Sequence, residues 1–202
     1  MEQRKIKVSV IVPVYNQEEL LKRCLDSIPV RDDVEAVIVD DGSTDSTPGI
    51  IGDFMSETKL KVSLVTHPRN LGLPKACNDG TELCRGEYIY YLDSDDYLYT
   101  ENFVKAMDFL DGTDLVFIDA MMDGQRILRQ EGNSLCAAWF KFIRREYLGD
   151  YRREDVPCGS DRLLNDYLMS RPHTERQTGL LAYHYTFPRK GSLTWINTNS
   201  RS

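Results

Sequence analysis

Two hydrophobic periods alternate along the first half of the chain. Residues 6–15 form a near-continuous run of branched apolar side chains, which is typical of a strand that is buried on both faces. Apolar positions three and four apart over residues 20–28 then predict a helix, with Asn16 and Glu19 as a capping box at its start. The succession repeats, with strands predicted at 34–39, 61–66 and 87–92 and helices at 48–55 and 70–84.

This alternation predicts an α/β fold whose central sheet is mostly parallel and flanked by helices. The second half is less regular, and residues 137–148 fit neither period clearly. We expect a single domain over residues 1–202, with a flexible polar tail at 197–202. The other predicted elements are a helix from Thr100, a strand at 114–122 with an antiparallel return at 125–130, a helix at 160–169 and an edge strand at 180–185.

Composition and charge exclude several classes of protein. With 41% hydrophobic and 28% charged residues among 202, the chain can bury a sizeable core. Its net charge is −7, from 25 basic and 32 acidic residues, which argues against nucleic acid as a partner. The five cysteines form no C-x-x-C pair, and no segment has the apolar core of a signal peptide or the ~20 apolar residues of a membrane span. We therefore expect a cytoplasmic protein with reduced thiols.

Acidic residues follow two of the predicted strands. Asp40 and Asp41 end one strand, and Asp93, Asp95 and Asp96 follow another, so both groups are expected at one edge of a parallel sheet. Two carboxylates ~4 Å apart repel by about 4 kcal/mol at an effective dielectric constant near 20. A divalent cation such as Mg²⁺ or Mn²⁺, held by one or two carboxylates and by substrate phosphates, would remove that repulsion. The alternative is that both segments are ordinary turns, which Asp, Ser and Gly favour.

Four segments, in order and with fitting spacing, resemble the family 2 glycosyltransferases of the GT-A fold. They are residues 8–16 (VSVIVPVYN), 39–45 (VDDGSTD), 70–80 (beginning NLG) and 86–96 (ending LDSDD). The resemblance implies a Rossmann-like GT-A sheet, with a nucleotide-sugar-binding half at about 1–112 and a smaller, irregular acceptor-binding half at about 113–196.

The resemblance also implies roles on the nucleotide side. Pro13 and Tyr15 would line the nucleotide pocket at the end of the first strand. Asp41 would hydrogen-bond the base, usually uracil, and Asp40 would shape the same turn.

Asp93-Ser94-Asp95 matches the D-x-D motif of the family. The match implies that Asp93 and Ser94 lie at the nucleotide, with Asp93 near the ribose or the metal-bound water. Asp95, and with it Asp93, would hold Mn²⁺ or Mg²⁺, which neutralises the diphosphate as it leaves. One position departs from the pattern, since the family often has arginine where this chain has Cys77. Either Lys75 or Arg69 would then supply the charge, and Cys77 is expected to be a small core residue.

An inverting transfer needs a carboxylate that removes the proton of the acceptor hydroxyl. Gly159-Ser160-Asp161 resembles the family element that carries this base, so Asp161 is the predicted catalytic residue. The alternative is a capping role only, because Ser and Asp are preferred at any helix N-terminus. Asp155 and Asp119 are further candidates for the base.

The last candidates lie on the acceptor side. Trp139 and Lys141 belong to a stretch that resembles the Trp-x-Lys-x-x-x-Arg segment of the family, and an amphipathic helix packed on the sheet is the alternative. Aromatic and basic residues interleave there, which leaves peripheral membrane contact open. Arg189 is a candidate for binding the diphosphate, and His184 is a candidate metal ligand or an ordinary hydrogen-bonded histidine.

The resulting prediction is a metal-dependent, inverting glycosyltransferase. It would move one sugar from a nucleoside diphosphate sugar, first of all a UDP-sugar, to a hydroxyl of a glycan, lipid-linked or protein acceptor. It would be non-processive, because residues 177–181 do not match the Gln-x-x-Arg-Trp motif of processive members, and it would act in the cytoplasm or at the inner face of the membrane. The alternatives are a non-catalytic nucleotide-sugar or glycan-binding module and a sugar nucleotidyltransferase. A nucleotidyltransferase should have a glycine-rich phosphate loop after the first strand, which this chain lacks.

Overall fold

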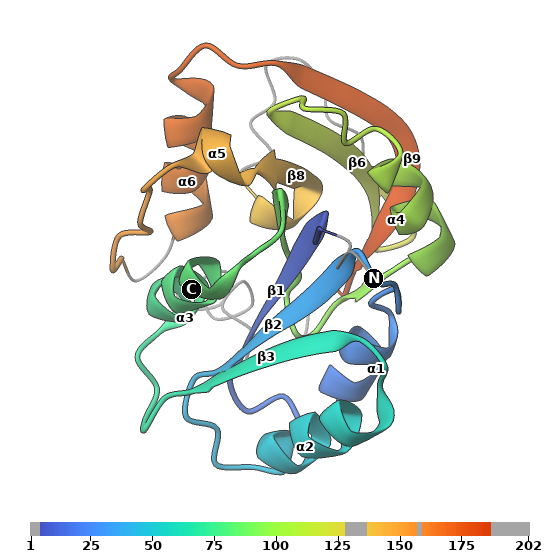
Figure 1. Ribbon diagram of the computed structural model, residues 1–202. Helices are drawn as coiled ribbons and strands as arrows, with labels where there is room; N and C mark the ends of the chain where they lie inside the picture. The colour runs from blue at the N-terminus through green and yellow to red at the C-terminus, as the bar shows by residue number, and fades with distance from the viewer. Residues whose placement is uncertain (1–4, 128–136, 157–158, 187–202) are drawn as a thin grey trace.

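The protein is described by a computed structural model that covers residues 5–127, 137–156 and 159–186. Four strands of the first half form a parallel sheet in the order β3-β2-β1-β4 (Figure 1). Every residue of β1, β2 and β4 is buried, which explains their nearly continuous apolar sequence. The bounds are β1 (Val8–Val14), β2 (Val34–Asp40), β3 (Lys61–Thr66) and β4 (Tyr88–Tyr91).

Three helices flank these strands. α1 (Leu21–Asp26) and α2 (Thr47–Glu57) lie on one side of the strands, and α3 (Leu73–Leu83) lies on the other (Figure 1). α3 comes close to the sheet at Gly80, where an added Cβ would lie 2.6 Å from Cγ2 of Ile11 and 3.2 Å from Cγ2 of Val39. Gly80, which lowers the helix propensity of this segment, is therefore explained by the close packing of α3 on the sheet.

The second half extends the sheet with strands of both directions. β8 (Lys141–Arg144) is antiparallel to both β4 and β6 (Leu115–Met122), and β9 (Glu175–Tyr185) is parallel to β6. β1, β2, β3, β4, β6 and β9 therefore all run in one direction, which confirms an α/β fold with a mostly parallel central sheet. The other elements are β5 (Tyr97–Leu98), α4 (Thr100–Met107), β7 (Gln125–Ile127), a 3₁₀ turn (Ala138–Phe140), α5 (Arg145–Leu148) and α6 (Ser160–Met169).

Two local predictions are wrong. Asn16 does not cap α1: its backbone has φ 48° and its Oδ1 accepts a hydrogen bond from the backbone N–H of Thr44 (2.8 Å), so it joins two loops. The strand predicted at 180–185 is not an edge strand, because β9 lies between β6 and the short strand β5. The pairing of Leu98 with Tyr183 brings a segment distant in sequence to cover that edge.

The aromatic and basic stretch around Trp139 does not form a continuous amphipathic helix, and its aromatic side chains are buried. It forms the 3₁₀ turn followed by β8, and the side chains of Phe140, Lys141 and Phe142 are buried. These residues offer no face to a membrane, so the stretch gives no support to peripheral membrane contact. In the described ranges no helix combines the length and the apolar character needed to cross a bilayer.

We expect Gly80→Ala to destabilise the protein by about 1–2 kcal/mol, because the methyl group is pressed into Ile11 and Val39 and this overpacking outweighs the ~1 kcal/mol that alanine gains in helix propensity. Gly52→Ala is the matched control, since Gly52 also lies within a helix but has no atom within 4 Å of its would-be Cβ. That variant is expected to gain up to about 1 kcal/mol. Urea unfolding of both variants measures the difference, and equal stabilisation by the two alanines would contradict the close packing of α3.

Candidate active site

The carboxyl ends of three neighbouring strands bring the predicted acidic segments to one edge of the sheet. β1 lies between β2 and β4, and both pair with it in parallel. Asp40 pairs with Val14, and the backbone N–H of Asp41 donates to the carbonyl oxygen of Val14 (2.8 Å). On the other side, the N–H of Leu92 donates to the carbonyl oxygen of Ile11 (2.9 Å), just before the acidic turn 93–96. The prediction that both carboxylate groups share one edge is confirmed.

Two predicted nucleotide-pocket residues end β1 at the same edge. Pro13 is buried within the strand, opposite Val39 of β2. Tyr15 follows the strand and is 44% exposed, which makes it one of the few large apolar side chains at the surface. Their contact with a nucleotide stays a prediction.

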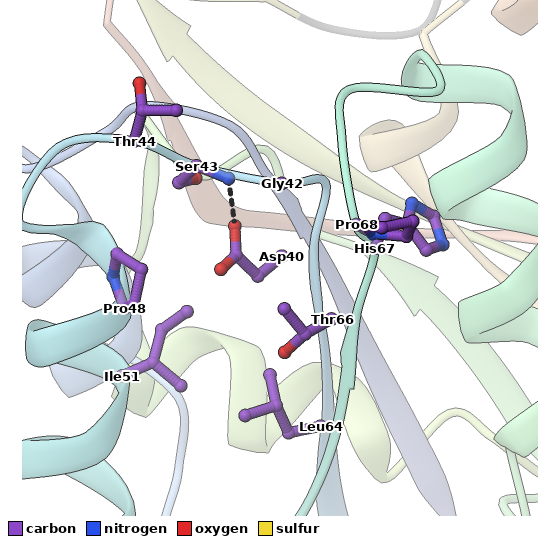
Figure 2. Close-up of a pocket in the computed structure, with 10 residues that line it drawn as sticks. All are labelled: Asp40, Gly42, Ser43, Thr44, Pro48, Ile51, Leu64, Thr66, His67 and Pro68. Carbon is purple, nitrogen blue, oxygen red and sulfur yellow. Dashed lines mark hydrogen bonds between the residues drawn. The ribbon is translucent and has the colours of Figure 1, made fainter.

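The carboxylates of Asp40 and Asp41 accept hydrogen bonds from different segments. Asp40 is buried, and its Oδ1 accepts a hydrogen bond from the N–H of Ser43 (3.0 Å), which closes the turn after β2. Figure 2 shows its carboxylate beside a cavity of about 240 Å³ between α2 and strands β2 and β3, while the ring of His67 points away from that cavity. The cavity is lined by Asp40, Gly42, Ser43, Thr44, Pro48, Ile51, Leu64, Thr66, His67 and Pro68, so of the predicted nucleotide residues only Asp40 borders it.

The carboxylate of Asp41 is held by hydrogen bonds from the segment that follows β3. Its Oδ1 accepts from the N–H of Leu71 (2.8 Å) and its Oδ2 from the N–H of Gly72 (2.8 Å). The segment can approach because Gly42 has φ 75° and lacks a side chain, and a Cβ there would meet the backbone of Arg69 at 2.4 Å. The D-D-G-S sequence therefore builds a fixed acceptor at the strand end.

His67 completes the clamp on Asp41, and sequence reasoning missed it. The buried imidazole bridges two carboxylates, with Nδ1 2.6 Å from Oδ1 of Asp41 and Nε2 2.8 Å from Oδ2 of Asp79. Lys75 pairs with the other oxygen of Asp79, so this lysine is already engaged within its own helix. Burial alone would lower the pKa of His67, but the hydrogen bonds and charges of Asp41 and Asp79 outweigh it and raise the pKa above 6.5.

The acidic turn 93–96 concentrates negative charge in a poorly solvated place. Burial raises the pKa of Asp93 well above its usual value, and the charges of Asp96, Asp161 and Asp95 raise it further. Arg153 acts in the opposite direction on the same carboxyl group. Burial and the repulsion of neighbouring carboxylates therefore both disfavour ionisation of Asp93.

Asp96 lies at the inner end of this turn. Its Oδ1 accepts from the N–H of Thr186 (2.7 Å), and its Oδ2 accepts from the hydroxyl of Tyr183. Burial and then the charge of Asp95 raise the pKa of Asp96 to about 7 despite these bonds. Ser94 is also buried, and the carbonyl oxygen of Asp95 accepts from Nη2 of Arg23 (2.9 Å).

An all-oxygen cluster whose carboxyl groups resist ionisation fits Mg²⁺ or Mn²⁺, because a divalent cation favours the charged forms. Within the described residues, no three His, Cys, Asp or Glu side chains surround one metal position. The geometry fits an ion that takes one or two protein ligands and completes its shell with phosphate oxygens and water.

Asp161 lies in the first turn of α6, as the sequence predicts, and its side chain is one-third exposed. Its Oδ2 accepts from the N–H of Ala138 (3.0 Å), and its Oδ1 forms an ion pair with Nη1 of Arg153. It gives no side-chain cap to its own helix, where Gly159 is the N-cap residue. Asp161 therefore ties α6 to the 3₁₀ turn and stands close enough to Asp93 to affect its pKa.

The two weaker candidates for the base have other surroundings. Asp119, on β6, forms an ion pair with Arg126 of β7. Asp155 lies in the irregular segment before α6.

The positive charge beside Cys77 is that of Arg153, which lies far from Cys77 in the sequence. Cys77 is a buried core thiol, and burial raises its pKa to about 12 while the charge of Arg153 opposes this. The two substitutes considered from the sequence are elsewhere: Lys75 pairs with Asp79, and Arg69 is exposed. No pattern in the sequence marks Arg153, because it follows α5 in a stretch without regular structure.

Trp139 and Lys141 are buried parts of the acceptor half. The ring of Trp139 stacks on that of Tyr183, with centroids 4.4 Å apart and planes at 7°. Lys141 has no exposed surface, and its Nζ donates to the carbonyl oxygen of Ala137 (3.1 Å) and lies 5.7 Å from the ring of Phe117. The structure gives both residues structural contacts, and a role in acceptor binding stays a prediction.

His184 packs against β5 rather than joining the carboxylates. Its ring stacks on Tyr97 with centroids 4.4 Å apart, and its Nδ1 lies 3.0 Å from the hydroxyl of Tyr99. Burial, and then the nearby charge of Arg23, lowers its pKa below 6.5. Arg189 lies outside the described residues.

A comparison against protein families agrees with this fold. The model of "Glycosyl transferase family 2" matches residues 9–164. The chain belongs to glycosyl transferase family 2. The match includes β1, the acidic turn and Asp161, so it extends across both halves of the sheet.

Three individual proteins are similar to this chain over different lengths. A poly(ribitol-phosphate) beta-glucosyltransferase of Bacillus spizizenii is 37% identical over 109 residues, which are 52% of this chain and 17% of that protein. TarS residues 1–349 of Staphylococcus aureus in complex with UDP have a TM-score of 0.78 at 25% identity, over 90% of this chain and 60% of that one. Mannosyltransferase PcManGT of Pyrobaculum calidifontis, in complex with GDP-Man and Mn²⁺, shares the fold, with a TM-score of 0.74 at 21% identity. The chain thus spans only a part of these relatives.

The bridge at His67 predicts a pH-dependent contribution to stability. The raised pKa means that the folded protein favours imidazolium, so the stabilisation is full below pH 6.5 and is lost as the pH rises through the folded-state pKa. We expect His67→Gln to cost about 2 kcal/mol at pH 6, as for hydrogen bonds to charged groups, and clearly less at pH 9. Urea unfolding at both pH values measures this. Asp79→Asn keeps the shape of the residue that contacts His67 but removes its negative charge, so this variant should show a weaker pH dependence of stability. An equal loss of unfolding free energy for His67→Gln at both pH values would contradict the bridge.

Proposed function

We propose that this chain transfers one sugar from a nucleoside diphosphate sugar to an acceptor hydroxyl with inversion at the anomeric carbon. The observation that carries the proposal is the meeting of two carboxylates from different halves: Asp93 at the end of β4 and Asp161 at the start of α6 are close enough for the second to raise the pKa of the first. A transfer needs this arrangement, with one group at the leaving diphosphate and another at the attacking hydroxyl.

The donor is proposed to be a UDP-sugar. Asp41 is a buried, fixed carboxylate at the edge where Tyr15 is exposed, which suits hydrogen bonding to a base that stacks or lies against an aromatic ring. Oδ1 of Asp41 accepts two bonds and Oδ2 accepts one, so Oδ2 retains capacity for a base N–H. The similarity to TarS, whose structure contains UDP, supports the same choice.

Asp95 and Asp93 are the residues proposed to hold Mn²⁺ or Mg²⁺. A bound cation supplies positive charge to the diphosphate that departs. Burial and neighbouring carboxylates raise the pKa values of Asp93 and Asp96 in this turn, so binding of the ion with the donor is expected to favour their ionised forms.

Asp161 is proposed to remove the proton of the acceptor hydroxyl. The hydroxyl oxygen attacks the anomeric carbon as the bond from that carbon to the diphosphate oxygen breaks; the proton passes to Asp161 and the electron pair leaves with the diphosphate. Both oxygens of Asp161 already accept one hydrogen bond, and each retains a lone pair for the acceptor.

The acceptor is proposed to be a glycan or another chain rich in hydroxyls. The relative from Bacillus spizizenii is named for poly(ribitol-phosphate), a polymer of that kind. Transfer of a single sugar per encounter, a lipid-linked or protein acceptor, and action in the cytoplasm or at the inner membrane face remain predictions from the sequence.

Asp95→Ala is expected to weaken binding of UDP in the presence of Mn²⁺ by at least about tenfold, since even outer-shell partners of a metal are worth that much. Isothermal titration calorimetry with Mn²⁺, and with EDTA in its place, measures the loss. Asp53→Ala is the control, because Asp53 is an exposed carboxylate of α2, away from this edge. Equal UDP affinity with and without the ion would overturn the proposed metal dependence.

Asp161→Asn is expected to lower the rate of sugar transfer by roughly 10²–10⁴-fold while leaving UDP-sugar binding unchanged. A panel of nucleotide sugars, tested first for cation-dependent thermal shift and slow hydrolysis, identifies the donor for this assay. Tight binding without hydrolysis or transfer by the unaltered chain would favour a non-catalytic binding module. Release of pyrophosphate from UTP and a sugar phosphate would favour a nucleotidyltransferase.

A further inference from the structure

Arg153 is a buried cation that no part of the proposed mechanism uses. Its side chain is 2% exposed, although it belongs to the irregular segment between α5 and α6. The guanidinium lies 4.4 Å from the centroid of the Tyr91 ring, at the end of β4. A charged side chain is almost never buried to this extent unless it is paired, because desolvation costs several kcal/mol.

Arg153 pairs with Asp161 and stands among the other charges of the site. Its Nη1 donates to Oδ1 of Asp161 and lies 3.4 Å from Oγ of Ser160. The charge of this guanidinium also opposes the rise in the pKa of Asp93, so Arg153 offsets charge on both sides of the proposed reaction centre. Nε of Arg153 is buried without a hydrogen-bond partner in the described part of the chain.

Asn78 fixes the backbone that carries Arg153. Oδ1 of Asn78 accepts from the N–H of Arg153 (2.8 Å), and Nδ2 of Asn78 donates to the carbonyl oxygen of Arg153 (3.0 Å). This pair of bonds joins α3 of the nucleotide half to the segment that precedes α6. Arg153 is therefore held at its backbone by Asn78, and at its guanidinium by the face of Tyr91 and by Asp161.

The carboxylate of Asp161 has two anchors, and they act on different oxygens. The N–H of Ala138 holds Oδ2 (3.0 Å), and Arg153 holds Oδ1. Two fixed donors define the plane of a carboxylate, whereas one leaves it free to rotate about the Cβ–Cγ bond. An exposed aspartate without them would sample other orientations in solvent.

We propose that Arg153 is a positioning residue for Asp161: through its clasp to Asn78 and its stacking on Tyr91, it sets the carboxylate plane that receives the acceptor proton and couples that plane to the nucleotide half. This proposal rests on the proposed function. Under this proposal, the orientation of the Asp161 carboxylate depends on the planar shape of the Arg153 guanidinium and not on its charge alone.

Arg153→Met is expected to lower kcat about 10- to 100-fold, the usual effect of losing a group that orients an active-site residue, with KM for the donor changed by less than about threefold. Arg152→Met is the matched control: it makes the same substitution at the next residue, whose side chain is about half exposed and pairs with Glu82 (3.2 Å). The control should keep the kcat of the unaltered chain. A kcat within about twofold of that value for Arg153→Met would overturn the proposal.

A double-mutant cycle with Asp161→Asn separates positioning from general structural support. If Arg153 acts through Asp161, the double variant is no slower than Asp161→Asn alone; fully additive losses would overturn the proposal. Arg153→Lys covers the case in which the methionine variant does not fold. Lysine keeps the charge but lacks the planar fork, so we expect a folded protein with kcat reduced about tenfold, and an unchanged kcat would again overturn the proposal. No turnover by the unaltered chain with any donor would refute the proposed function, and this role with it.

Discussion

The organisation of the site follows from electrostatic repulsion among carboxylates at one edge of the sheet. Parallel strands with β1 at the centre place Asp41 on one side and Asp93–Asp96 on the other, and α6 adds Asp161. Each pair at contact distance would cost about 4 kcal/mol in a partly solvated environment. The fold tolerates these carboxylates for two reasons. Basic side chains lie beside some of them, and the carboxylates of the acidic turn suit a cation that would bind together with the proposed donor.

The two counter-charges inside the protein work in the same way. His67 bridges Asp41 to Asp79, and Arg153 pairs with Asp161 while lying against Tyr91. In both cases a buried basic side chain meets a carboxylate that is also held by a backbone N–H. The carboxylates are thereby fixed in place before any ligand binds, which is the condition for electrostatic preorganisation. In the turn 93–96, by contrast, burial and neighbouring carboxylates raise the pKa values of Asp93 and Asp96, which distinguishes the proposed place for a cation from the proposed places for base recognition and proton removal.

The sequence predicted the donor half well because its information is local. Strands such as residues 61–66 and helices such as the one predicted at 70–84 follow from the period of apolar positions, and the carboxylates were found because they directly follow strands. His67 and Arg153 were missed for a physical reason: each lies in a segment without periodicity, and its importance comes from partners that are distant in sequence. The cap predicted at Asn16 failed for the same reason, since its side chain serves the N–H of Thr44 and not its own helix.

The acceptor half owes its form to contacts between distant segments, and this has a consequence for how the site is assembled. The position of Asp161 depends on Ala138 in the 3₁₀ turn, on the clasp between Asn78 and Arg153, and so on the packing of two halves that are separated in sequence. The 3₁₀ turn is in turn held by the hydroxyl of Tyr90, which donates to the carbonyl oxygen of Trp139. The Asp41 clamp, by contrast, uses only residues between β2 and α3. The proposed nucleotide-binding edge can therefore form from the first half of the sheet, whereas the orientation of the proposed base requires the whole sheet to be complete.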